Sequence, residues 1–184
     1  MLLILTLIVL LALLAWGVFA FNRLVRLRNQ QRTAWADIDV QLQRRHDLVP
    51  QLVHVVQAYA GHEASTLQAV TDLRVQAMGL KQPGQLGEVE SSLEHALGRV
   101  MALQEAYPDL KANQNFAQLQ DDLVKVEEQL QYARRFYNGA VRDYNDGRQL
   151  FPDLMVAKLG GFTDVAFFQA EADSRAAVKV ELQQ

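Results

Sequence analysis

The chain has 184 residues, of which 18 are Lys or Arg and 21 are Asp or Glu, so its formal net charge is -3. This slightly acidic balance argues against a nucleic-acid partner, because a protein that binds nucleic acid carries a basic field over its soluble part. The absence of cysteine excludes disulfides, thiolate metal ligands and a cysteine nucleophile. Beyond the first 21 residues, the chain has the size of one domain with a single core.

The N-terminal residues 1–21 contain no charged side chain and are mostly apolar. As a helix, the run from Leu2 to Phe21 is about 30 Å long, which matches the hydrocarbon thickness of a bilayer. We therefore predict a transmembrane anchor over residues 1–21. The residues assigned to this span include Leu2, Leu5, Leu11, Trp16 and Phe21.

A cleavable signal peptide is the alternative for this segment, because Val18-Phe19-Ala20 resembles a small-residue cleavage site. Two features favour an uncleaved anchor. No Lys or Arg precedes the apolar run, and several arginines follow it at once. Basic residues in that position disfavour translocation of the downstream chain.

Four arginines follow the predicted anchor, and no acidic residue lies among them: Arg23, Arg26, Arg28 and Arg32. Basic residues beside a membrane span stay on the cytoplasmic side, where they meet anionic lipid headgroups. This pattern predicts a single-pass protein of the bacterial cytoplasmic (inner) membrane, with the N-terminus outside and the remainder in the cytoplasm. The simpler interpretation is that these arginines are the solvated start of a helix.

Beyond the anchor, apolar residues recur every three or four positions, which is typical of helices and not of strands. The pattern predicts helices near residues 22–60, 62–80, 86–107 and 110–148. We therefore predict an all-α fold, with the transmembrane helix followed by an antiparallel four-helix bundle of long helices over residues 22–150. The clearest seam lies in the last helix and comprises Phe116, Leu119, Leu123, Val126, Leu130, Ala133, Tyr137, Ala140 and Tyr144.

Turn and capping residues predict the helix boundaries. Gln82-Pro83-Gly84 predicts a turn. Either Asp109 or Asn113 is expected to cap the last helix. The residues expected to end that helix are Asn145, Gly147 and Pro152. A break at Gly61 stays open, because one glycine costs a helix only about 1 kcal/mol and residues 22–80 could form one long helix.

The C-terminal residues 151–184 form a third region in this prediction. The segment LFPDLMVAKLGGFTDVAFF, residues 150–168, is apolar but contains three charged residues, so it is too polar to span a bilayer. It is expected either to cover the end of the bundle or to lie on the membrane surface. Residues 170–184 are expected to form a short helix and a loose tail.

A group of charged residues surrounds Pro50, which is expected to kink its helix because it leaves the carbonyl of His46 without a helical donor. One interpretation is that these residues bind a partner or lipid headgroups. The other is that they form ion pairs with charged residues of the last helix, within the bundle. Pairing is favoured because Arg45 lies on the apolar stripe and needs a partner, with Glu127 and Glu128 among the acids considered. The residues assigned to this cluster are Arg44, Arg45, Asp47, Arg134, Arg135 and Asp143.

The pair His62-Glu63 resembles the start of a zinc-protease motif, but the position of the second histidine holds Thr66. One such ligand does not hold a catalytic zinc. The histidines at 46, 54, 62 and 95 are therefore interpreted as surface or capping residues. The sequence predicts no catalytic residues, no metal site and no cofactor.

Several stretches resemble the signatures of the bacterial LemA family. They are NRLVRLRNQQRTAWADIDVQLQRRHDLVPQLV, YAGHEASTLQAVTDLR, AYPDLKANQNFAQLQDDL and ARRFYNGAVRDYN, in this order between Asn22 and Pro152. The resemblance implies an antiparallel four-helix bundle on one transmembrane helix and a break near Gly61. It implies no catalytic activity or cofactor. A tyrosine is usual in the family where this chain has His46, so a buried or stacked role for that position is not expected.

The sequence is compatible with two functions, and neither is enzymatic. The first is a structural or scaffold protein that presents a helical bundle at the membrane for self-assembly or partner binding, with the lipid bilayer and a homo-oligomer as expected partners. The second is an accessory or adaptor in membrane proteolysis or the envelope stress response. It depends on the resemblance, because some family members are encoded near a membrane metalloprotease.

Overall fold

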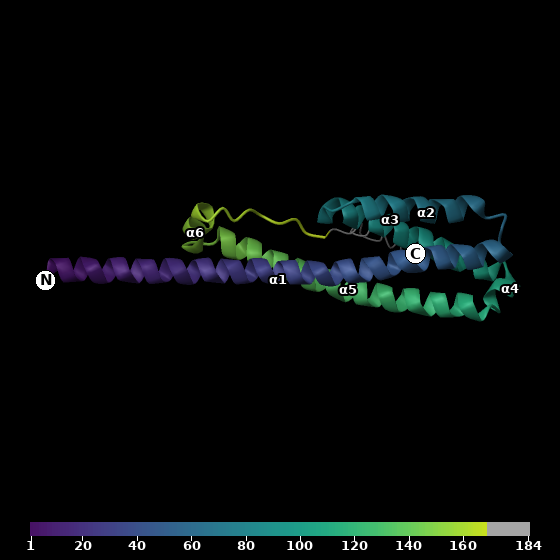
Figure 1. Ribbon diagram of the computed structural model, residues 1–184, viewed down its shortest axis with the longest axis horizontal. Helices are drawn as coiled ribbons and strands as arrows, with labels where there is room; N and C mark the ends of the chain where they lie inside the picture. The colour runs from purple at the N-terminus through teal and green to yellow at the C-terminus, as the bar shows by residue number, and fades with distance from the viewer. Residues whose placement is uncertain (169–184) are drawn as a thin grey trace, which may run out of the picture. The chain divides into compact units, whose positions relative to one another are not determined.

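The computed structural model describes residues 1–168, and every regular element in this range is a helix (Figure 1). The predicted all-α class is thereby confirmed, while the prediction for residues 170–184 lies outside the described residues. In chain order the elements are α1 Leu2–Tyr59, α2 Ala64–Gly79, α3 Pro83–Ala102, the 3-10 turn η1 Leu103–Glu105, α4 Pro108–Lys111, α5 Gln114–Gln149 and α6 Asp153–Leu159.

Helix α1 has 58 residues and continues without interruption from the apolar N-terminal run through Pro50. The predicted anchor over residues 1–21 and the helix predicted near residues 22–60 therefore form one continuous helix. The helix ends at Tyr59 and α2 begins at Ala64, so the single helix over residues 22–80 is wrong. Gly61 lies in this connection, where a residue without a side chain is easily accommodated.

Two other boundaries differ from the prediction. Pro83 and Gly84 form the first turn of α3, because proline at the first helical position loses no hydrogen bond. Asn145 and Gly147 lie inside α5, which continues to Gln149. The predicted cap at Asn113 is confirmed, since its Oδ1 accepts a hydrogen bond from the Phe116 amide at 3.0 Å.

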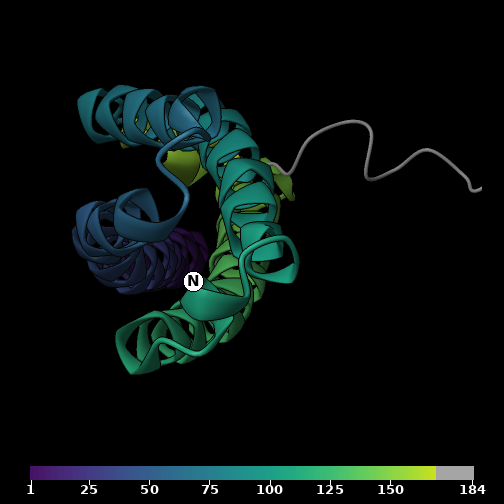
Figure 2. The same cartoon turned by 90° about the vertical axis from the view of Figure 1, so that its right-hand side faces the viewer.

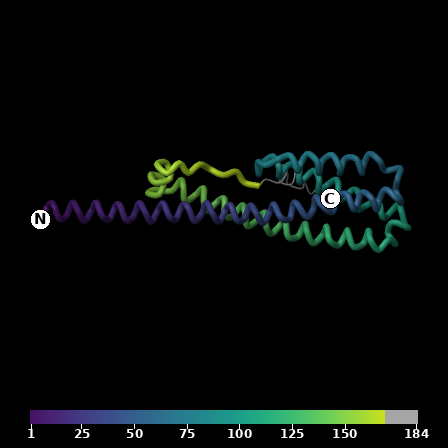
Figure 3. The backbone as a smooth tube through the Cα atoms, viewed as in Figure 1, coloured from purple at the N-terminus to yellow at the C-terminus, as the bar shows by residue number. Residues whose placement is uncertain are grey.

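The helices divide between two compact units, which are described separately. Unit 1 comprises Met1–Gln41 and Gln129–Phe167, and unit 2 comprises Leu42–Glu128 together with Phe168 among the described residues. Helices α1 and α5 contribute to both units. In unit 1 the end of α5 runs beside α1 in the opposite direction, and α6 follows it (Figure 3).

The first residues of α1 extend beyond α6 with no neighbouring element in unit 1 (Figure 3). Their large apolar side chains are exposed, from Met1 to Leu14. Among the described helices, α1 alone has a segment long and apolar enough to cross a membrane, and none of that segment is buried. A core helix of a soluble protein would bury such residues.

In unit 2, short loops join α1 to α2 and α2 to α3, whereas η1 and α4 lie between α3 and α5. Figure 2 views these helices end-on with α4 near the viewer. Their apolar stripes share one core. The core residues are Val49, Leu52, Val56, Ala60, Leu67, Val70, Leu93, Ala96, Leu97, Val100, Leu110, Phe116, Leu119 and Leu123. The heptad spacing of the sequence thus corresponds to side chains that are buried between helices.

Candidate functional site

Within unit 1, the end of the apolar run in α1 contacts α6 through a charged pair and contacts Phe162, which follows α6, through aromatic and cationic side chains. Arg23 Nη1 lies 2.5 Å from Asp153 Oδ2. The Phe21 and Phe162 rings meet edge to face with centroids 5.5 Å apart. The guanidinium of Arg28 lies 5.0 Å from the centroid of the Phe162 ring. Of the four predicted interface arginines, Arg23 and Arg28 therefore contact the C-terminal segment. Arg26 and Arg32 are exposed.

The segment after α6 is hydrogen-bonded along α5. The Tyr144 and Tyr137 hydroxyls donate to the backbone oxygens of Thr163 and Ala166, each at 2.9 Å. The Asn145 amide group binds both backbone groups of Val165, with distances of 2.9 and 3.1 Å. Leu24, Tyr144, Ala157 and Phe162 form a small apolar cluster. Residues 153–167 therefore pack against α1 and α5 within unit 1.

Gly160 allows Phe162 to enter this cluster. A Cβ added at Gly160 would lie 2.6 Å from Phe162 Cε2, and the ring is buried. We expect Gly160→Ala to lower the free energy of unfolding of unit 1 by about 1–3 kcal/mol, as overpacking does. Urea titration would measure this loss. Gly139→Ala is the control within unit 1, because a Cβ there meets nothing within 4 Å and alanine costs a helix less than glycine. Equal stability of both variants would contradict this packing.

A buried charge network occupies the middle of unit 2. Arg45, on α1, is almost fully buried, and its guanidinium pairs with Glu90 on α3 and with Glu127 on α5. The distance from Arg45 Nη1 to Glu127 Oε2 is 3.0 Å. The other oxygen of Glu90 lies 2.7 Å from His46 Nε2. The basic residue in the apolar stripe therefore has two acidic partners.

The environment of Glu90 favours its charged form. Burial by itself raises the pKa of this carboxyl. The hydrogen bond with His46, the charges of Arg45 and His46, and the hydrogen bond with Arg45 together outweigh burial and lower the pKa below its ordinary value. Glu90 is thus a carboxylate that the fold holds ionised between two basic side chains.

The structure corrects two expectations about residues 45–50. His46 was expected at the surface, but it is buried, because its ring reaches Glu90. Glu90 itself was not among the predicted site residues. The carbonyl of His46, which Pro50 deprives of a helical donor, accepts a hydrogen bond from Arg74 Nε of α2 at 2.6 Å. Unit 2 thereby supplies the donor that proline removes.

The other residues of the predicted charge cluster have different surroundings. In unit 2, Arg44 is exposed and Asp47 accepts a hydrogen bond from Gln43 at 2.9 Å. In unit 1, the Arg135 guanidinium lies 4.6 Å from the Tyr132 ring centroid, and Asp143 lies 3.6 Å from Arg142. Arg134 is partly buried in unit 1. Of the six predicted residues, Arg45 is the one that lies in the buried network.

The residues considered for zinc lie at the start of α2. His62 is exposed. Glu63 immediately precedes α2, and its carboxylate accepts a hydrogen bond from the Tyr107 hydroxyl at 3.4 Å. Glu63 thus has a partner within unit 2.

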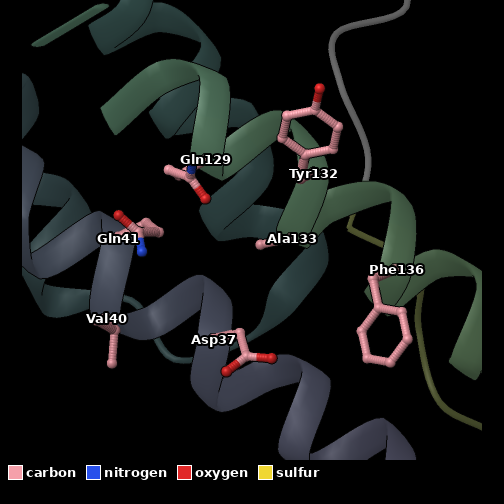
Figure 4. A pocket seen from close by; sticks show the side chains of 7 residues that line it. All are labelled: Asp37, Val40, Gln41, Gln129, Tyr132, Ala133 and Phe136. Atoms are coloured by element: carbon pink, nitrogen blue, oxygen red, sulfur yellow. The ribbon is translucent and has the colours of Figure 1, made fainter. Parts of the chain in front are cut away.

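A groove of about 380 Å³ lies on unit 1 between α1 and α5 (Figure 4). Gln41 and Gln129 reach toward it from opposite helices, while Val40 and the hydroxyl of Tyr132 point outward (Figure 4). Val40, Tyr132 and Phe136 are all exposed apolar or aromatic side chains. Asp37 and Ala133 complete the lining.

Comparison with known proteins decides the family. The LemA family model matches residues 34–182, which is most of the chain. The chain belongs to the LemA family. This confirms the resemblance seen in its helical signatures.

Two relatives of this LemA-family protein carry the name magnetosome protein. It is similar to magnetosome protein MamQ 2 of Paramagnetospirillum magneticum, with 24% identity over 187 residues that cover 86% of this chain and 68% of the relative. Magnetosome protein MamQ of Magnetospirillum gryphiswaldense is 22% identical over 174 residues, covering 80% of this chain and 64% of the relative.

Proposed function

We propose that this LemA-family protein is a non-enzymatic scaffold that is anchored in the bacterial cytoplasmic membrane and presents an antiparallel four-helix bundle to copies of itself. The observation that carries this proposal is the continuity of α1. Within unit 1, one helix includes both the exposed apolar segment and buried residues such as Leu24 and Ile38. A helical connection of this kind suits a protein that holds the groove of unit 1 close to the membrane.

The groove on unit 1 is the surface that we assign to self-assembly. Val40, Tyr132 and Phe136 are more than half exposed, and aromatic side chains are enriched in protein interfaces. The names of the relatives place them with a cellular structure, the magnetosome, and name no reaction. Both observations support a structural role.

The test is the mass of the full-length protein in nanodiscs, measured beside the variant Tyr132→Glu/Phe136→Glu. The scaffold proposal expects an assembly for the wild type and a monomer for the variant, because two charges replace the aromatic surface. Val124→Glu is the control, since Val124 is exposed on the same helix outside the groove. A monomeric wild type that cross-links to no copy of itself in cells would refute self-assembly and favour the adaptor function, with a membrane protease as partner.

The orientation of the anchor gives a second prediction. Changing Arg23, Arg26, Arg28 and Arg32 to Glu is expected to disturb insertion or reverse orientation, because each basic residue contributes about 1 kcal/mol of attraction to anionic headgroups. Protease accessibility in cells measures the side on which the helical part lies. The control changes the same four residues to Lys and keeps the charge. A glutamate variant that retains the cytoplasmic orientation would show that these arginines do not determine topology.

A further inference from the structure

We infer that the outer face of α6 is a second membrane contact, which docks on the lipid headgroup region beside the span. This inference rests on the proposed anchor and goes beyond it, because it gives the C-terminal segment a lipid-binding role. Four large apolar side chains of this segment are strongly exposed: Leu150 at 60%, Phe151 at 80%, Met155 at 57% and Leu159 at 90%.

Leu150 and Phe151 precede α6, and the other two exposed side chains lie on one side of the helix. Met155 and Leu159 are four residues apart and therefore share a face of the helix. Asp153 and Ala157, which are displaced by two positions, are buried on the opposite face. The helix thus turns its acidic residue, Asp153, toward the protein and its largest exposed apolar side chains, Met155 and Leu159, outward. An ordinary helix on a water-exposed surface has its large apolar residues on the inner face.

The position of α6 along α1 places this face at the membrane boundary. The contacts of α6 and Phe162 with α1 involve Phe21, Arg23 and Arg28. Seven residues of helix extend about 10 Å, and Arg23 lies only about 3 Å beyond Phe21 along the axis. The polar zone of a bilayer is about 5–8 Å thick on each side, so α6 lies at that depth whenever the apolar run spans the hydrocarbon core.

The charges of this region also suit an anionic lipid surface. Asp153, the acidic residue of α6, is paired with Arg23. Asp164 lies 3.8 Å from Arg148. Lys158 and Arg26 are exposed, so their charges are available to headgroup phosphates. An apolar face with exposed cations beside it is the pattern of an interfacial helix.

The experiment uses the full-length chain in nanodiscs of phosphatidylethanolamine and phosphatidylglycerol. Because the chain contains no cysteine, Met155→Cys carries one spin label at a defined position. Collision rates with oxygen, which concentrates in lipid, and with a water-soluble nickel chelate are then compared. The control is Val124→Cys, whose parent side chain is 53% exposed compared with 57% for Met155.

We expect the label at residue 155 to favour oxygen and the label at residue 124 to favour nickel. Adding Phe151→Asp and Leu159→Asp to Met155→Cys should shift its label toward nickel, because two charges oppose entry into the interface. These parent side chains are exposed, so the changes leave the packed face of α6 intact.

Equal nickel access at residues 155 and 124, with the protein retained in nanodiscs, would overturn lipid docking and leave the anchor unaffected. Dipolar broadening together with low access to both reagents would also overturn it, because a second copy would then cover α6. Failure of the protein to remain in nanodiscs would refute the anchor itself and, with it, the docking.

Discussion

Replacing Glu90 with alanine is expected to lower the free energy of unfolding of unit 2 by about 3–5 kcal/mol, which is the usual cost of removing one partner of a buried ion pair. Arg45 would remain almost fully buried with Glu127 alone, and His46 would lose its partner. Since a domain is stable by only about 5–15 kcal/mol, this change removes a large part of the total.

Urea titration followed by far-UV circular dichroism measures this loss. Glu88→Ala is the matched control, because Glu88 is exposed on the same helix and its replacement should change stability by less than about 0.5 kcal/mol. The double variant Arg45→Met/Glu90→Leu should recover much of the stability, because it removes both buried charges together. Equal free energies of unfolding for Glu90→Ala and Glu88→Ala would show that the network contributes nothing to the stability of unit 2.

The same network predicts a pH dependence. The pKa of Glu90 is lower in the folded state than its ordinary value of 4.5, so protonation favours the unfolded state. The stabilisation is fully present above pH 4.5 and is lost as the pH falls through the folded pKa. The stability difference between wild type and Glu90→Gln should therefore decrease with acidification. A difference that grows toward low pH would contradict the sign of this shift.

Leu130→Asp is expected to unfold unit 1. Leu130 is completely buried in the seam of α5, so the variant loses the burial of a leucine and places a carboxylate without a designed partner in the core. The first effect alone costs about 2–5 kcal/mol, and an unpaired buried charge costs several more. Together these costs approach the whole stability of a domain.

Trp35 fluorescence reports this unfolding locally. Its ring centroid lies 5.2 Å from that of Tyr137 in unit 1, and the second tryptophan, Trp16, is changed to Phe in both proteins compared. The control is Val124→Asp, since Val124 is exposed on the same helix and tolerates a charge. A Leu130→Asp protein with the wild-type melting curve would mean that Leu130 is not a core residue.

The helical class and most of the buried stripe could be predicted from spacing, because burial between helices imposes a period of three and four residues. In α5 the predicted seam residues Phe116, Leu123, Leu130 and Tyr144 are all buried. Asn113 could be identified as a cap because its short side chain satisfies a free amide within one turn. These features depend on local chemistry, which the sequence contains.

Features that depend on distant partners could not be predicted in the same way. The burial of Glu90 depends on its contacts with Arg45 and His46, which lie more than forty positions away in the chain. Nothing near Arg74 indicates that it would bind the His46 carbonyl. The sequence indicated that Arg45 needs an acidic partner, but it did not indicate that Glu90 is one of the partners.

Helix α1 has no flexible joint between its apolar run and Leu24, which is buried in unit 1. A span adjusts to bilayer thickness by tilting, since its apolar length must match the hydrocarbon core. In the proposed arrangement the same helix enters unit 1, so its tilt would pass to α6 through the Arg23–Asp153 pair and to the segment after α6 through the contact of Phe21 with Phe162. Under the proposed anchoring, membrane thickness would therefore set the angle between unit 1 and the bilayer.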